Sequence, residues 1–348
     1  MSHYDSFKLR LLPKLPYSFC IFLTFNHIGR YNANLYLTFS QARVILIHNL
    51  WHKSIGECMT KVIATATNKG GEGKTTMSIM LADYAAMVMN KRVLAIDLDP
   101  QANFSKYYLN LEYDPVYKGG KIPPLHPEYN ADSDVGWDGR STIANIFYGE
   151  EVVPYPTSFS NIEILPAHSA KLQEAEAVTK NEVLEKVHLQ LKNFVLLPEV
   201  QEEYDIIVID TPPSKGPLTI AGIKACTDMV IPAQMEEDSI DGIYGMLQLW
   251  KQETYARPAE NPINIAGILA NRVRDVSLHK SFFDHLKSLE STKNYVIDDK
   301  IKERIIYGEL RVKEDRPKSV FDLPKDHAAR VECETVCKNI MGRIYNHG

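Results

Sequence analysis

The stretch Lys69-Gly-Gly-Glu-Gly-Lys-Thr-Thr76 has the residue types that a triphosphate needs around it. Because glycine has no Cβ, successive backbone N–H groups in such a loop can turn toward phosphate oxygens without a steric clash. The lysine and the hydroxyl that close the loop can bind the outer phosphates and Mg²⁺. We therefore predict an ATP site whose nucleotide-binding residues are Lys69, Gly70, Gly71, Glu72, Gly73, Lys74, Thr75 and Thr76.

Two aspartates further along the chain, Asp97 and Asp210, each end an apolar run. Carboxylates at the ends of strands can hold the waters around a Mg²⁺ ion, which keeps several waters of its own. The sequence predicts a Mg²⁺ site at which Thr75 is a direct ligand and the two aspartates act through water.

Strands and helices must alternate to position these residues. An apolar run at 61–67 precedes the loop, and helical spacing follows it at 75–90. Further apolar runs alternate with helical segments, and this predicts an α/β fold of the P-loop NTPase type, a mostly parallel sheet with helices on both faces. The runs lie at 92–98, 161–165, 204–209, 228–232 and 263–271, and the helical segments at 169–195, 216–225, 239–253 and 278–290. A Pro- and Gly-rich stretch at about 111–160 is interpreted as an irregular insertion with one short helix at 141–148.

Composition excludes several classes of protein. The 348 residues carry a net charge of −5, so the whole chain is not a polycation that coats nucleic acid or lipid. Its 5 cysteines include no Cys-x-x-Cys pair, which favours a reducing cytoplasm over a disulfide scaffold. Cys333 and Cys337 are spaced for one helix face, and we expect them to pack rather than to bind a metal.

The first 58 residues differ from the rest, with six Lys or Arg against two acids. The apolar run at 15–25 superficially resembles a signal peptide, but it is too short to span a bilayer and lacks a clear cleavage site. Met59 stands just before the expected first strand. We interpret 1–58 as upstream sequence included by a wrong start choice, or alternatively as a disordered arm, and 59–348 as the P-loop ATPase domain.

Taken together, these motifs resemble the ParA/Soj family of DNA-partition ATPases, which are relatives of MinD. That family has a deviant Walker A loop with an extra lysine ahead of the glycines, and Lys69 occupies its place. Asp97-Leu-Asp99-Pro-Gln-Ala-Asn103 and Ile206-Ile-Val-Ile-Asp210-Thr-Pro-Pro213 match two further family motifs. The resemblance covers about 61–345 and includes the stretches 161–167, 230–234 with Gly242, and 267–272.

The resemblance implies a cytoplasmic, nucleoid-associated ATPase that dimerises with ATP and drives plasmid or chromosome partition with a ParB-like centromere-binding protein, without stable membrane association. It implies catalytic roles for Lys69, which would cross to the partner's nucleotide, for Lys74, and for Asp99, which would position the attacking water. Asn271 and Arg272 would lie near the adenine. Nonspecific DNA would bind a C-terminal segment, 300–318, with seven basic residues against four acids, through Lys302, Arg304, Arg311, Lys313, Arg316 and Lys318.

Plainer interpretations stay open for these residues. Lys69 could be a solvated lysine, Asp99 a helix N-cap, 271–272 a simple strand end, and 300–318 a solvated charged face. Glu72 departs from the family, which usually has a small apolar residue there. Because a carboxylate facing phosphates is repelled, we expect its side chain to point away, toward a dimer partner.

Three other functions remain as alternatives. A MinD-like membrane-associated positioning ATPase would need a terminal amphipathic basic helix, but the tail at 336–348 is better interpreted as the last core helix. A relative of the nitrogenase iron protein would need paired thiolates, and Cys226 alone of the core cysteines precedes a strand. An ATP-liganded regulator with little hydrolysis would differ in turnover.

Overall fold

A computed structural model of the chain describes residues 59–134, 136–311 and 317–346. Its centre is a seven-stranded sheet with the order β5-β6-β2-β7-β1-β8-β9. All neighbouring strands pair parallel except β5, which runs antiparallel to β6. The predicted α/β fold is therefore confirmed. The strands are β1 (Lys61–Thr65), β2 (Val93–Asp97), β5 (Tyr155–Pro156), β6 (Ile162–Leu165), β7 (Ile206–Asp210), β8 (Asp228–Ala233) and β9 (Asn264–Ala270), and a separate antiparallel pair consists of β3 (Glu112–Tyr113) and β4 (Lys121–Ile122).

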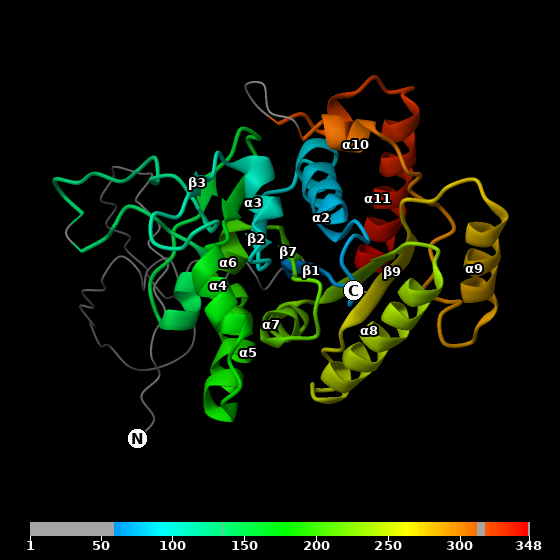
Figure 1. Cartoon of the computed structure of the whole chain (residues 1–348), viewed down its shortest axis with the longest axis horizontal. Coiled ribbons are helices and arrows are strands. Elements are labelled where there is room, and N and C mark those ends of the chain that lie inside the picture. The colour runs from blue at the N-terminus through cyan, green and yellow to red at the C-terminus, as the bar shows by residue number, and fades with distance from the viewer. Residues whose placement is uncertain (1–58, 135, 312–316, 347–348) are drawn as a thin grey trace, which may run out of the picture. The chain divides into compact units, whose positions relative to one another are not determined.

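Helices cover both faces of the sheet, as Figure 1 shows. Because side chains alternate along a strand, Ile63 and Val208 pack under one layer while Val62 and Ile209 pack under the other. The first layer contains α2 (Lys74–Asp83), α3 (Asn103–Tyr108) and α11 (Ala328–Asn346); the second contains α4 (Ser169–Glu176), α5 (Asn181–Val195), α7 (Pro217–Ala225) and α8 (Glu237–Tyr255). The remaining helices are α6 (Pro198–Glu203), α9 (Ser277–Ser288) and α10 (Ile306–Glu309), with 3-10 turns at Ile143–Tyr148 and Val320–Asp322.

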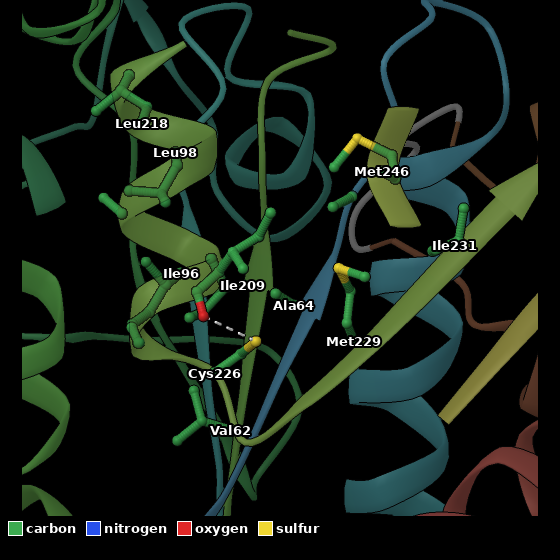
Figure 2. Packing of buried hydrophobic residues seen from close by; sticks show 14 of the residues in the cluster. Val62, Ala64, Ile96, Leu98, Ile209, Leu218, Cys226, Met229, Ile231 and Met246 are labelled. Atoms are coloured by element: carbon green, nitrogen blue, oxygen red, sulfur yellow. Dashed lines mark hydrogen bonds between the residues drawn. The ribbon is translucent and has the colours of Figure 1, made fainter. Parts of the chain in front are cut away.

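The second layer shows how densely the sheet is covered. Figure 2 draws Val62 of β1, Ile96 of β2, Ile209 of β7 and Leu218 of α7, which all belong to one cluster of buried apolar side chains. Cys226 is buried in the same cluster, where its Sγ donates to the carbonyl of Ile223 at 3.3 Å. The strands that carry the candidate site are thus held by a continuous apolar layer.

Several helices differ from the prediction. The single helix expected at 169–195 is two, α4 and α5, separated by a stretch with the β-branched pair Val178-Thr179, which is unfavourable in a helix. The helix expected at 75–90 ends in five π-helical residues, Tyr84–Val88. The short helix α6 was not predicted, and α3 entered only as the helix that Asp99 could cap, because six residues are too few to show a helical period. The last core helix is confirmed as α11, with Cys333 and Cys337 buried on it.

The sheet is irregular at both of its outer sides. At one side, β5 is two residues long and includes Pro156, which has no N–H to donate. At the other side, residues 295–302 run along β9: the N–H of Ile268 donates to the carbonyl of Tyr295 at 2.8 Å, and that of Ile301 donates to Ala270 at 3.0 Å. The stretch 111–160, predicted as an insertion, contains β3, β4, β5 and the 3-10 turn at Ile143–Tyr148. In the described residues, no helix combines the length and the apolar character that crossing a bilayer requires.

A buried carboxylate on α2 gives the fold a pH dependence. Asp83 accepts hydrogen bonds from the hydroxyls of Tyr107 and Tyr108 at 2.9 and 2.8 Å. Burial raises the pKa of Asp83 from 3.8 to about 6, against the lowering effect of these hydrogen bonds. The folded protein therefore holds this proton more tightly than the unfolded chain. The stability that the proton contributes is present below about pH 4 and is lost as pH rises to about 6.

Asp83→Asn is expected to remove this dependence, because the amide stays neutral at every pH. The free energy of unfolding of the wild type, minus that of the variant, should fall by about 1 kcal/mol between pH 5 and pH 7. Urea unfolding of both proteins across that range measures the difference. A difference that does not change with pH would show that Asp83 is already ionised at pH 5.

Candidate nucleotide site

The carboxyl ends of five strands meet at the candidate site. The glycine-rich loop follows β1, Asp97 ends β2 and Asp210 ends β7. Asp210 is paired in register with Thr65 on one side and with Asp97 on the other. Parallel strands end at the same edge of a sheet, so residues far apart in the sequence are brought together there. Residues just after β8 and β9 complete the surroundings of the loop.

The loop itself has a backbone that favours glycine. Gly71 and Gly73 have φ values of 86° and 81°, in the left-handed region. Gly73 is also the N-cap of α2, and a Cβ at this position would overlap with the side-chain amide of Asn271. The positive end of the α2 dipole therefore faces the loop, where it attracts phosphate.

Side chains after β8 and β9 hold the loop from its outer side. The carbonyl of Gly71 accepts from Gln234 Nε2 at 2.9 Å and from Arg272 Nη1 at 3.1 Å. The carbonyl of Glu72 accepts from Asn271 Nδ2 at 2.7 Å. Because a peptide unit is planar and trans, a carbonyl held outward turns its amide N–H the opposite way. These contacts preorganise the loop for an anion.

The structure thus gives Asn271 and Arg272 contacts that the sequence did not suggest. They contact the loop backbone directly, and their contact with adenine stays a prediction. Arg272 also pairs with Glu303, at 2.7 Å. Gln234 was missed as a site residue, although its position as a polar residue directly after the apolar strand β8 was a usable signal.

Lys74 and Asp99 form a buried pair beside the loop. Lys74 Nζ lies 3.9 Å from Asp99 Oδ2, and both side chains are under 10% exposed. The other oxygen of Asp99 accepts from the N–H of Gln101 at 2.9 Å. Burial raises the pKa of Asp99, while Gln101 and Lys74 act against it. The N-cap of α3 is Ala102, so the interpretation of Asp99 as a helix N-cap is wrong.

The residues predicted to serve Mg²⁺ are adjacent. Thr75 Oγ1 donates to Asp210 Oδ2 at 2.7 Å, and Ser78 donates to Asp210 Oδ1 at 2.9 Å. Asp97 Oδ2 accepts from both the N–H and the hydroxyl of Ser105, each at 2.7 Å. Burial, followed by the neighbouring Asp210, raises the pKa of Asp97. Ser78 and Ser105, which orient the carboxylates, were not predicted.

This donor set fits Mg²⁺. It offers only hard oxygen ligands, and the carboxylates of Asp97 and Asp210 repel each other, which a divalent cation would relieve. Across the described ranges, no three His, Cys, Asp or Glu side chains are grouped closely enough to hold a metal by themselves. Phosphate oxygens and water would therefore supply most of the coordination, with Thr75 as the direct protein ligand.

Lys69 and Glu72 both face the segment that opens α8. Lys69 Nζ lies 3.5 Å from Glu236 Oε2 and 3.7 Å from Asp238 Oδ2. Glu72 is 2% exposed, and its carboxylate accepts from Ser239 Oγ at 2.7 Å and from the N–H of Gln234. Its side chain points away from the loop interior, as expected. The expectation that it faces a dimer partner is wrong, because its carboxylate is buried within its own chain.

The basic segment predicted to bind DNA is engaged in contacts within the chain. Lys302 pairs with Asp275 at 2.9 Å, and Arg304 pairs with Glu332 at 3.1 Å. Arg311 donates to the hydroxyl of Thr76, in the first turn of α2. The carbonyl of Lys318 accepts from the Tyr107 hydroxyl at 3.2 Å. Lys313 and Arg316 lie outside the described residues, so DNA binding stays a prediction for the whole set.

The sequence and the fold are similar to known proteins. The AAA domain family matches residues 60–260. The chromosome-partitioning ATPase Soj of Thermus thermophilus is 30% identical over 209 residues, 60% of this chain and 67% of that protein. A protein named as a replication protein A from Sinorhizobium fredii is 37% identical over 186 residues, which are 52% of this chain and 40% of that relative.

Among solved structures, an ATP complex of a McdA variant from Cyanothece has the same fold. Its TM-score is 0.61 at 19% identity, and the match covers 81% of this chain and 96% of that one. Likeness at this identity supports the fold alone. The AAA domain match spans more than half of the chain, and the Soj match covers two thirds of that protein. The chain therefore belongs to the ParA/Soj family of partition ATPases.

Proposed function

We propose that this protein binds and hydrolyses ATP with Mg²⁺, and that it couples this cycle to DNA partition. The observation that carries the proposal is the loop at 69–76: two of its carbonyls accept hydrogen bonds from side chains that follow β8 and β9, and its Lys74 forms a buried pair with Asp99. The relative from Thermus thermophilus is named a partitioning ATPase, and the McdA variant was solved as an ATP complex.

Hydrolysis would rest on positioning and charge neutralisation rather than on covalent chemistry. The loop N–H groups and Lys74 would bind the phosphates, and Thr75 would hold Mg²⁺, with Asp97 and Asp210 acting on the ion through water. Asp99 lies next to Lys74, where a carboxylate can accept a hydrogen bond from the attacking water and align it. Magnesium, when bound, neutralises charge on the outer phosphates.

Assembly would follow from Lys69. In this chain the lysine is half-buried and held by Glu236 and Asp238, and crossing to the nucleotide of a second copy would exchange these carboxylates for phosphate. Hydrolysis would then depend on an ATP-bound homodimer. We further propose that the dimer is cytoplasmic, binds nonspecific DNA of the nucleoid, works with a ParB-like centromere-binding protein, and has no stable membrane association.

DNA binding is expected to require ATP and to weaken with salt. If about four phosphates are neutralised per dimer, log K should fall with log salt at a slope near −3.6. Lys313→Glu with Arg316→Glu should abolish binding to any duplex, while ATP turnover without DNA persists. Arg311 is left unchanged because it contacts Thr76 in the helix of the phosphate loop. Fluorescence anisotropy with ATP and with ADP, alongside phosphate release, measures both properties.

A charge-matched control is available on the same protein. Lys287→Glu with Lys293→Glu changes the charge by the same amount at lysines that pair with Asp298 and Glu290, at and just beyond α9. This control should keep most of the DNA affinity. Equal losses in the two double variants, or equally tight binding with ADP and ATP, would contradict the assignment of the basic segment.

A further inference from the structure

The phosphate loop contains a buried carboxylate, that of Glu72. Glu72 is 2% exposed, and burial raises the pKa of its carboxyl, with the bonds from Gln234 and Ser239 opposing this effect. An ionised side chain is costly to bury unless hydrogen bonds satisfy it. Each oxygen of Glu72 has one such donor, from the residue that follows β8 and from the first turn of α8.

The segment that Glu72 contacts is the one that contacts the rest of the loop. Gln234 also donates its side-chain amide to the carbonyl of Gly71, and Glu236 and Asp238 are the acids that hold Lys69. Glu72 therefore ties 234–239 to the loop at a point between the two lysines. A shift of this segment would move the acids near Lys69 and a donor to the loop backbone at the same time.

We propose that Glu72 is a positioning residue: its carboxylate fixes the phosphate loop to the beginning of α8, and so sets both the phosphate-binding shape of the loop and the hold on Lys69. The proposal rests on the proposed ATP-binding function. Glu72 itself needs no contact with nucleotide, because its side chain faces Gln234 and Ser239.

Two substitutions at this position separate shape from bonding. In Glu72→Gln, the amide oxygen can still accept from the N–H of Gln234, and the amide nitrogen can donate to Ser239, whose hydroxyl also accepts. In Glu72→Val, the N–H of Gln234 loses its side-chain acceptor. Ser239→Ala, added to Glu72→Gln, removes only the contact with α8 and leaves the contact with Gln234.

The test uses the full chain in four forms: wild type, Glu72→Gln, Glu72→Val, and Glu72→Gln with Ser239→Ala. Three quantities are measured: the Kd for ATP by titration of a fluorescent analogue, the Tm, and the rate at which acetic anhydride modifies Lys69. The modification is followed by peptide mass spectrometry, with exposed Lys106 as an internal reference.

We expect the Kd for ATP of Glu72→Gln to stay within about twofold of the wild-type value, and Glu72→Val to bind ATP roughly tenfold more weakly. Lys69 should be modified faster in the valine variant, and the double variant should be intermediate.

Each outcome decides the matter. ATP affinity and Lys69 reactivity unchanged in Glu72→Val would overturn the proposal. So would faster modification of Lys69 and Lys106 together, which would indicate general loosening of the fold. If the valine variant does not fold, a double variant identical to Glu72→Gln in both readouts overturns the proposed link to α8. If the wild type binds no ATP, the proposed function fails. The rates of Lys69 modification in the four forms then test the role of Glu72 by themselves.

Discussion

Lys74→Ala is expected to abolish measurable ATP binding, whereas Lys69→Ala should bind ATP and fail to dimerise or hydrolyse it. Lys74 is buried against Asp99, so its loss leaves that carboxylate without its cation, near Asp97 and Asp210. The loss also removes the cation that faces the phosphates, and truncating one partner of a buried charge pair at a binding site costs about 2–5 kcal/mol, roughly thirtyfold or more in affinity. Lys69 is partly exposed and bonded only weakly to two acids, so ATP should still bind without it.

Titration with a fluorescent ATP analogue and sedimentation with and without ATP distinguish the two lysines. Lys106→Ala, at an exposed position on α3, is the control for loss of a lysine and should resemble the wild type in both measurements. An equal loss of ATP binding in the Lys69 and Lys74 variants would refute the role of Lys69 across the dimer.

Gly73→Ala is expected to impair ATP binding as strongly, for a steric reason. Alanine in the left-handed region costs about 1–2 kcal/mol, and the new methyl group would overlap with the Asn271 amide that holds the carbonyl of Glu72. Relief of this overlap would displace either the loop or its donor. We expect at least a hundredfold weaker ATP binding, from about 3 kcal/mol of lost preorganisation.

A second glycine provides the matched control. Gly119 has φ of 85°, close to that of Gly73, but a Cβ there would meet no described heavy atom within 4 Å beyond its chain neighbours. Gly119→Ala therefore carries the same backbone strain without the collision, and should lower the Tm slightly while leaving the Kd for ATP unchanged. Adding Asn271→Ala to Gly73→Ala should relieve the collision and recover that part of the stability, but not the affinity, because the loop still lacks its donor. Wild-type affinity in Gly73→Ala would contradict the steric argument.

The order of strands and helices was predictable because buried parallel strands are continuous apolar runs, such as Ile206–Asp210. That the loop with Lys74 and Thr75 lies close to the two strand-end aspartates was predictable, because strand ends converge at one edge of the sheet. Glu72 illustrates the limit. Repulsion from phosphate predicted that its side chain points away from the phosphates. Its partners Gln234 and Ser239 could not be predicted, because they are over 160 residues away in the sequence and are brought to Glu72 only by the packing of β8 and α8.

The basic segment shows a second limit. Counting charges between 300 and 318 treats each side chain as free, whereas Lys302 and Arg304 are paired with acids that lie outside that window. Charge counts along a sequence cannot include such partners. Asn271 was similarly placed by its position after a strand, yet its hydrogen bond to the loop depends on Gly73 leaving room for it.

The two sides of the sheet restrict how copies of this protein can join. Unpaired strand edges are the usual template for chain-to-chain β-pairing, the geometry of fibres and of many unwanted aggregates. Here one outer strand is two residues long and contains Pro156, and the other has residues 295–302 bonded along it. Sheet extension is therefore blocked at both sides of the described sheet. Reversible association of copies would therefore have to use loops and helix surfaces.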